Sequence, residues 1–300
     1  AGANVLVEKP LAGSVAEAEA VHLEEKKSGK FVAVGFQDLY DPGTAWLKKE
    51  LVSGTIGTIQ AVRFLGLWPR RRSYFTRNEW AGRLQTHGIP VLDSPLNNAF
   101  GHFVMLSLFF ASPESRGASA AKPDGVELFR AHAIESFDTA VAKLHTAEGV
   151  KLWFGVSHVS GEALEPEIFI HGSAGTAGWR YENETWLIDV NGRREQRSMP
   201  SMTATRQSMM ATVLRRLWDP QAPICGVEMA LRHTEVIEAI HRACPIRTFP
   251  PEMVHWKSGD GAEADIPVVA GLTAAMQRAF AAQELLTRCD FNPGLQQTAG

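Results

Sequence analysis

Apolar and polar positions in the N-terminal part of the chain follow a strand–helix–strand pattern. A short apolar run at Asn4–Val7 is followed by a helical pattern after Ser14 and a second apolar run at 31–36. Ser14 and Glu17 form a capping box, and Gly29 marks the end of the helix. Continuous apolar runs are typical of parallel strands that are buried on both faces. The pattern predicts one β-α-β unit, the building block of doubly wound sheets.

A unit with only two strands leaves sheet faces and an edge open, so we expect further strands to pair with it. No later segment repeats the β-α-β pattern, and residue 1 is Ala rather than Met. We therefore expect the missing strands to precede Ala1, so that the chain is a truncated form of a longer protein. Residues 1–40 are then the C-terminal part of a doubly wound domain, and residues 41–300 form a second domain.

The second domain begins with a helix, because Pro42 suits a first helical turn and Gly54 suits a helix stop. The pattern then predicts a strand at Thr58–Trp68, an irregular stretch rich in Arg and aromatic residues at 69–90, and an apolar helix at Asn97–Ser112.

Short strands separated by turn signals dominate the next eighty residues. They are expected at Glu127–Ile134, Thr139–Thr146, Val150–His158, Glu167–His171, Ala177–Tyr181 and Thr185–Val190. Short turns such as Asn191-Gly192 favour antiparallel meander pairing. Helices follow at 202–218, 227–243 and 272–287, and they can cover one sheet face or return to the first domain. The fold class is therefore α/β plus α+β, with a mostly antiparallel open sheet and helices on one face.

Composition and charge narrow the possible functions. The net charge is −3 and the longest basic run is Arg70–Arg72, which argues against binding of nucleic acid or a membrane surface. No stretch approaches the apolar length of a membrane span. The three cysteines are far apart and form no CxxC, so we expect neither a disulfide framework nor a metal site. A reducing, cytoplasmic setting fits this composition best.

Lys9, in the segment Glu8-Lys9-Pro10, is the first candidate for chemistry. It follows the carboxyl end of a predicted parallel strand, the edge where open α/β sheets bind ligands. Partial desolvation there would lower the pKa of the lysine and suit it to proton transfer. The alternative is an ordinary solvated lysine in a loop.

Asn98 and His102 form a second candidate pair. Their i, i+4 spacing places both on one face of the predicted helix. A histidine is a natural acid or base near pH 7, and Asn98 could hydrogen-bond a substrate hydroxyl. The alternative is a buried structural histidine preceded by a capping asparagine.

The stretch Trp68–Arg83 interleaves aromatic residues with arginines, including Arg70, Arg77 and Trp80. Such side chains can stack on a sugar ring and bind its hydroxyls or a carboxylate. A solvated loop or a subunit contact explains the stretch equally well. Elsewhere, Gly259–Ala264 matches G-x-G-x-x-A, but no apolar strand precedes it, so the dinucleotide-binding interpretation lacks its required context.

Several of these segments together resemble one family, the Gfo/Idh/MocA oxidoreductases. Val5–Leu11 is similar to the family's V-x-x-E-K-P-L segment. Val34–Gln37, Asp41-Pro42 and Gly54–Gly57 resemble its next strand, helix and entry into the second domain. Gly172–Thr176 resembles the glycine turn of its sheet.

The resemblance implies a Rossmann domain that binds NAD or NADP, and hydride transfer to or from a sugar, polyol or related hydroxylated substrate. It further implies that the G-x-G-x-x-G fingerprint should precede this chain and that a homo-oligomer could form through the antiparallel sheet. The implied site comprises catalytic Lys9 and His102, substrate-binding Asn97, Asn98, Arg70, Arg77 and Trp80, and cofactor-binding Glu8, Lys9, Pro10 and Gln37.

The chain departs from the family at one position of the implied site. An acidic residue usually stands one helical turn before the histidine, where this chain has Asn98; a shifted alignment would place Asp93 there instead. Asparagine cannot accept a proton as a carboxylate does, which leaves His102 and Lys9 as acid or base candidates. A non-catalytic relative that binds a sugar or a partner protein is therefore the alternative to an oxidoreductase.

Overall fold

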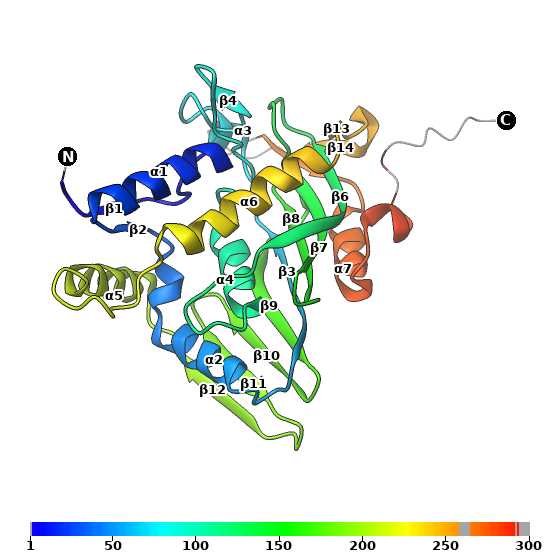
Figure 1. Ribbon diagram of the computed structural model, residues 1–300. Coiled ribbons are helices and arrows are strands. Elements are labelled where there is room, and N and C mark those ends of the chain that lie inside the picture. Colours follow the sequence, from blue (N-terminus) through cyan, green and yellow to red (C-terminus); the bar gives the residue numbers. More distant parts are fainter. Residues whose placement is uncertain (1, 258–264, 292, 294–300) are drawn as a thin grey trace.

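The computed structural model describes residues 2–257, 265–291 and 293 (Figure 1). The N-terminal part is the expected β-α-β unit: β1 (Val5–Val7), α1 (Val15–Ser28) and β2 (Val32–Val34), with β1 and β2 parallel. The side chain of Ser14 accepts a hydrogen bond from the backbone N–H of Glu17, and Gly29 ends α1 with φ 61°. Local capping signals therefore set this helix as the sequence predicts.

The middle of the chain leads from this unit into a large sheet. Its elements are the 3₁₀-helix η1 (Gln37–Tyr40), α2 (Pro42–Val52), β3 (Ile59–Leu67), α3 (Arg72–Phe75), β4 (Gln85–Thr86), β5 (Ile89–Pro90) and α4 (Gly101–Ala111). The stretch at 69–90 is thus mostly irregular, as expected, apart from one helical turn and a very short hairpin.

Most remaining elements belong to the sheet or cover it. The strands are β6 (Ala121–Arg130), β7 (Thr139–Thr146), β8 (Lys151–Ser157), β9 (Leu164–Gly172), β10 (Gly175–Arg180), β11 (Glu184–Ile188), β12 (Arg194–Ser198), β13 (Arg247–Thr248), β14 (Val254–Lys257) and β15 (Ile266–Val269). The helices are α5 (Met202–Arg215), α6 (Val227–Ala243), η2 (Pro251–Met253), α7 (Leu272–Ala282) and η4 (Leu286–Arg288).

Within the described residues the large sheet has nine strands in the order β12-β11-β10-β9-β3-β8-β7-β6-β13. The sequence predicts that β8 pairs with β9 in an antiparallel meander, and this is wrong. Strand β3 lies between them, parallel to β8 and antiparallel to β9. The sheet is therefore mixed. Residues 158–163 connect β8 to β9 and are long enough to step past an intervening strand, which a two-residue hairpin cannot do.

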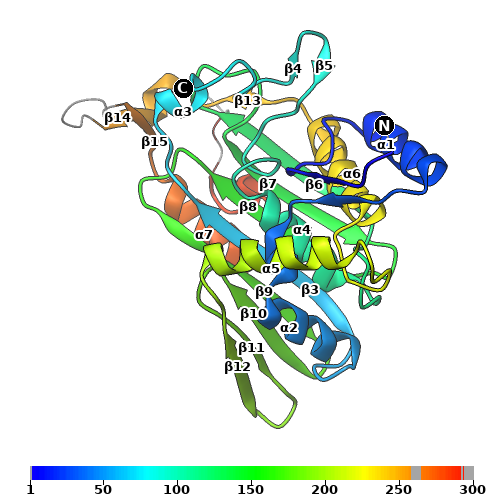
Figure 2. The ribbon, with the colours of Figure 1, turned by 90° about the vertical axis from the view of Figure 1, so that its left-hand side faces the viewer.

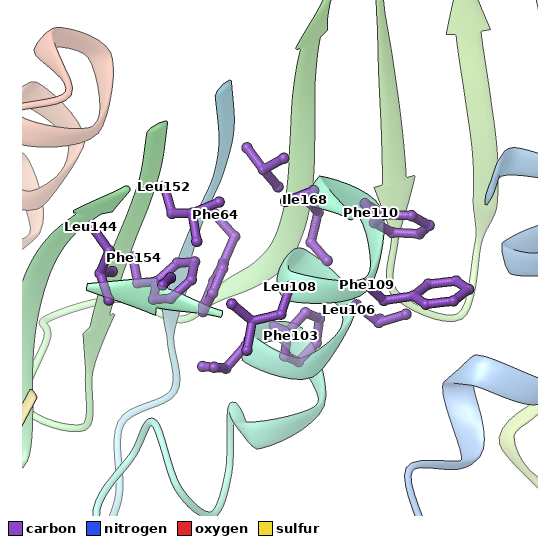
Figure 3. Packing of buried hydrophobic residues seen from close by; sticks show 14 of the residues in the cluster. Phe64, Phe103, Leu106, Leu108, Phe109, Phe110, Leu144, Leu152, Phe154 and Ile168 are labelled. Carbon is purple, nitrogen blue, oxygen red and sulfur yellow. The ribbon is translucent and has the colours of Figure 1, made fainter. Parts of the chain in front are cut away.

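Helices cover both faces of the sheet, so the expectation of helices on one face is wrong. Helix α4 is buried on almost every side between the sheet and α6, and its Phe103 packs against Phe64 of β3, with ring centroids 5.8 Å apart (Figure 3). Helix α7 packs on the opposite face, where its apolar side chains meet Trp153. Since side chains alternate along each strand, both faces carry apolar residues and both need cover.

Two helices return to the β-α-β unit, as the sequence allows. Figure 1 shows α6 beside α1, and Figure 2 shows α5 crossing near η1. Met209 and Val213 of α5 pack against the fully buried Ala33 of β2. The backbone N–H of Val34 donates to the carbonyl of Cys225, 2.8 Å away, so the segment before α6 covers the outer edge of β2.

The carboxyl end of α4 is held by a buried lysine. Lys48 of α2 donates hydrogen bonds to the carbonyl oxygens of Phe109 and Ser112, the latter 2.6 Å away. The carbonyls at a helix end have no partner within the helix, so a buried cation there is stabilising. Burial lowers the pKa of Lys48 to about 7. None of the described helices combines the length and apolar character needed to cross a membrane.

Two glycine-rich segments that the sequence singles out touch each other. The turn between β9 and β10 docks on the loop after α2: Ser173 Oγ accepts from the N–H of Thr58 at 3.0 Å, and the N–H of Ala174 donates to the carbonyl of Ile56 at 2.9 Å. Gly57 has φ 74°, and a Cβ there would lie 2.2 Å from Ser173 Oγ. Only glycine permits this approach.

We expect Gly57→Ala to lower the free energy of unfolding by roughly 2–3 kcal/mol, because it adds a clash with the turn to the strain of a left-handed alanine. Gly54→Ala is the matched control: Gly54 has φ 80° but nothing within 4 Å of a Cβ. It should cost about 1 kcal/mol. Urea unfolding measures both values, and equal losses would show that the docking contact contributes nothing.

Candidate active site

A cavity of about 300 Å³ opens where β1 ends. Four of the side chains predicted for the site line it: Lys9, Trp80, Asn97 and Asn98. Pro10, predicted to bind cofactor, and Asp93 also line it. The structure thus brings together residues from three segments, at the carboxyl edge of the parallel strands where ligands bind in open α/β sheets.

Lys9 is fixed by the turn that precedes α4. Its Nζ donates to the carbonyl of Asn98 at 2.5 Å and lies 3.4 Å from Asn98 Oδ1. The pKa of Lys9 is lowered to about 8, mainly by burial and in part by the positive charge of Arg77, whereas the charges of Glu8 and Asp93 oppose the shift. A substantial fraction of the amine is neutral just above neutral pH, so this lysine can accept or donate a proton.

Asp93 contacts the side chain of Asn98 and is part of the same hydrogen-bond chain as Lys9. The amide nitrogen of Asn98 donates to Asp93 Oδ1 at 3.0 Å, and the N–H of Gly82 donates to Asp93 Oδ2 at 2.6 Å. Burial raises the pKa of Asp93, and these two hydrogen bonds oppose that rise. A chain of contacts therefore runs from Gly82 through Asp93 and Asn98 to the amine of Lys9.

Asn97 has a structural role in addition to its place in the cavity. Its side-chain nitrogen donates to the carbonyls of Val91 and Leu92, each at 3.1 Å. These contacts close the loop that carries Asp93. Its amide nitrogen is therefore already engaged, and its role toward substrate stays a prediction that rests on its amide oxygen.

The expected helix start at Asn97 is wrong, because α4 begins at Gly101. Residues 94–100 form turns instead, with the N–H of Asn98 donating to the carbonyl of Ser94 at 2.8 Å. The i, i+4 argument for Asn98 and His102 therefore fails. Asn98 contacts Lys9 and Asp93, whereas His102 Nδ1 lies 3.2 Å from the carboxylate of Asp38.

Asp38 is a candidate that the sequence interpretation missed. It lies in η1 directly after Gln37, and its side chain is 9% exposed beside the 15% exposed His102. The two facing atoms, Asp38 Oδ2 and His102 Nδ1, are buried and lack a well-aligned hydrogen-bond partner among the described residues. The position of Asp38 just beyond a parallel strand was a signal that could have found it.

His233 of α6 was also missed, and it links the two halves of the site. The ring is fully buried, and burial lowers its pKa to about 3, with the charges of Lys9 and His102 lowering it further. Phe36 packs against both histidines, with ring centroids 5.7 Å from His102 and 5.2 Å from His233. Lys9 and His102 therefore lie around one buried imidazole.

Arg70 and Arg77 do not line the cavity but gather beside it. Arg77 lies 3.8 Å from the ring centroid of Tyr74 and 5.1 Å from that of Trp80, which lines the cavity. Arg70 lies 5.0 Å from the same Tyr74 ring. The structure thus places both arginines around one tyrosine at the edge of the candidate site.

The remaining residues predicted to bind cofactor lie at the ends of β1 and β2. Glu8 is exposed, and Gln37 is the first residue of η1. The N–H of Gly35 donates to the carbonyl of Val7, and a Cβ at Gly35 would lie 3.5 Å from the Cα of Glu8. The two strand ends therefore meet closely. The segment Gly259–Ala264, set aside as a dinucleotide motif, lies outside the described residues.

Comparisons with known proteins extend only to the fold. No family model matches the chain, and no curated protein matches it. Among solved structures, an NAD-binding oxidoreductase from Klebsiella pneumoniae superposes with a TM-score of 0.67 at 14% identity, over 81% of this chain and 72% of that chain.

Two further structures carry bound ligands. The WlbA dehydrogenase from Bordetella pertussis, in complex with NADH and UDP-GlcNAcA, gives a TM-score of 0.63 at 21% identity, covering 81% of this chain and 70% of that chain. KijD10, a 3-ketoreductase from Actinomadura kijaniata with NADP and TDP-benzene, gives 0.63 at 18% identity, covering 82% and 73%. This protein therefore shares the fold of NAD(P)-binding oxidoreductases.

We expect Asp93→Asn to lower the pKa of Lys9 below its value of about 8, because the carboxylate of Asp93 stabilises the charged amine. NMR titration of a lysine labelled at its ε carbon measures this pKa directly. Glu79→Gln is the matched control, since Glu79 is an exposed acid of the same loop that faces His87. An unchanged Lys9 titration in Asp93→Asn would show that the two charges are independent.

Proposed function

We propose that this protein is an oxidoreductase that transfers a hydride between NAD or NADP and a hydroxyl-bearing carbon of a sugar-like small molecule. One observation carries the proposal: a lysine with a pKa of about 8 lines a cavity at the end of a parallel strand and is held there by Asn98. That arrangement places a group able to exchange a proton where α/β proteins bind their ligands.

The proposal includes membership of the Gfo/Idh/MocA family. Its supports are the E-K-P segment at the cavity and the superposition on oxidoreductases that were crystallised with NADH or NADP. Residues 1–40 are then the end of a Rossmann domain and residues 41–300 the substrate domain. Among the described residues β1 pairs with β2 alone, and Val5 and Leu6 are exposed, as expected of an edge on which more strands add.

The residues at the strand ends fit the reactive end of a nicotinamide cofactor. Asp38 Oδ2 and His102 Nδ1 face each other at 3.2 Å but have no well-aligned hydrogen-bond partner among the described residues, so both could bind a polar group of the cofactor. Glu8, Lys9, Pro10 and Gln37 would hold that end of the cofactor. When bound, the cofactor would supply the hydride donor or acceptor.

Side chains of this protein would provide proton transfer, positioning of the catalytic amine and contacts with the sugar. Lys9, neutral above a pH of about 8, accepts the hydroxyl proton when the substrate is oxidised and returns it when the substrate is reduced. Asn98 and Asp93 fix the amine. Trp80 offers an aromatic face to a sugar ring, and His102 lies on the cofactor side with its ring turned to Asp38.

We expect Lys9→Met, made in the complete protein, to lower kcat by roughly 10²–10⁴-fold, the usual contribution of acid–base catalysis. In the unaltered protein the rate of oxidation should rise with pH through about 8, as the amine loses its proton, and this rise should vanish in Lys9→Met. Lys49→Met, a change at an exposed lysine remote from the cavity, should leave both kcat and the pH profile unchanged.

His102→Gln separates the two proton-transfer candidates. If Lys9 moves the proton, the rise near pH 8 persists in His102→Gln at a reduced rate. A profile that survives Lys9→Met and disappears in His102→Gln would assign the proton to His102. A protein that binds NAD(P) and sugars without any turnover would instead be the non-catalytic relative.

We expect Asp38→Asn to lower kcat roughly tenfold or more while KM changes little, because it keeps the shape of the side chain but removes the charge that faces His102. Asp219→Asn, at an exposed aspartate that pairs with Arg215, is the control and should have no effect. Steady-state kinetics with varied concentrations of substrate and cofactor measure kcat and KM separately. An increase in KM with kcat unchanged would mean that Asp38 contributes to binding only.

A further inference from the structure

The geometry points to a substrate with a negatively charged substituent, a carboxylate or a phosphate, bound by Arg70 and Arg77 around the ring of Tyr74 beside the Lys9 cavity. This inference rests on the proposed function of the site, but it concerns recognition of the substrate rather than transfer of the hydride. It restricts the expected substrates from sugar-like molecules in general to those that carry a negative charge.

The charges around the cavity do not balance. Lys9, Arg70 and Arg77 bring three cationic groups against two nearby carboxylates, Glu8 and Asp93, and within the described part of the chain neither arginine forms an ion pair. The carboxylate of Asp93 already accepts from Gly82 and Asn98. Several other arginines, by contrast, form ion pairs.

In the same loop, for example, Arg83 pairs with Glu135 at 2.8 Å. Most arginines on the sheet are also paired, such as Arg180, which pairs with Glu167 at 3.1 Å. Unbalanced guanidinium groups beside a cavity attract an anion.

Arg70 also carries an unsatisfied donor. Its Nε is buried and has no acceptor among the residues that the structure describes. The guanidinium lies 5.6 Å from the ring centroid of Trp68 and 5.0 Å from that of Tyr74. A buried N–H without an acceptor is costly, and an oxygen of a bound carboxylate or phosphate would relieve that cost.

The backbone holds Arg70 in a defined place before any ligand arrives. Its N–H donates to the carbonyl of His158 at 2.9 Å, and its carbonyl oxygen lies 3.2 Å from His132 Nε2. His132 in turn lies 2.9 Å from the buried carboxylate of Asp138. Because the backbone of Arg70 is already fixed, only its side chain has freedom to lose when a ligand binds, which favours affinity.

Arg77 connects this cationic group to the catalytic lysine. Its guanidinium lies on Tyr74 and near Trp80, and its charge is close enough to lower the pKa of Lys9. The aromatic rings offer flat faces for a sugar, while the arginines offer donors for its charged substituent. A bound anion would also offset the charge of Arg77, so its binding should raise the pKa of Lys9.

Calorimetric titration of the protein with three hexoses that differ only at carbon 6 tests the inference. The probes are glucose, glucuronate and glucose 6-phosphate. We expect at least one acidic hexose to bind about tenfold or more tightly than glucose, with a preference that weakens at high salt. The two acidic probes distinguish a carboxylate from a phosphate as the recognised group.

Arg77→Gln and Arg70→Gln should each remove most of this preference, with a much smaller effect on the affinity for glucose. Because Arg77 is exposed, its variant should fold normally even if Arg70→Gln does not. Arg197→Gln is the matched control: Arg197 also stacks on an aromatic ring, 4.7 Å from the centroid of Trp46, but it belongs to the distant edge strand β12. It should keep the full preference.

Two results would overturn the inference: acidic hexoses that bind no better than glucose, including no binding at all, or a preference that survives Arg77→Gln. Neither result depends on turnover. Oxidation of a neutral hexose with NAD(P), without a preference for acidic hexoses, would support the proposed function and contradict this inference. A preference for acidic hexoses without any turnover would support this inference and contradict the proposed function.

Discussion

One hydrogen bond, from the amine of Lys9 to the carbonyl of Asn98, joins the small parallel sheet to the turn before α4. The two residues are 89 positions apart, and each belongs to a different part of the fold. The contact fixes the position of the amine, and burial moves its pKa into the range useful for proton exchange. The cavity, Asp93 and Trp80 are arranged around this fixed amine.

The parts of the fold that the sequence predicts well are those set by local signals. Ser14 and Gly29 bound α1, and Asp41 with Pro42 starts α2, because caps act within a few residues. Pairing between distant segments leaves no such mark. The insertion of β3 into the sheet, the cover on its second face by α7, and the polar edge strand β12 could not be read from periodicity, since β12 has no apolar alternation.

The candidate site shows the same division. Lys9 was predictable because it follows a strand end, and Trp80 because it belongs to an aromatic loop. Asn97 and Asn98 were predicted from a helical spacing that the structure does not have and from the family resemblance, yet all four residues line one cavity. Asp38 carried one such signal, because it follows the end of a parallel strand, whereas His233 carried none, because its place in the site comes from neighbours far along the chain. Two aspartates from other segments also lie in this region: Asp93 accepts a hydrogen bond from Asn98, and Asp38 faces His102.

The pairing of Val34 with Cys225 makes growth of the parallel sheet one-sided. The segment before α6 occupies the outer edge of β2, so another strand can join only at β1. Such a strand would turn β1 from a border into an interior strand, with Lys9 at the middle of a wider carboxyl edge. The blocked edge also protects against chance pairing with other chains on that side. The backbone contact between Val34 and Cys225 thus leaves β1 as the edge at which a further strand can pair with the two-stranded parallel sheet.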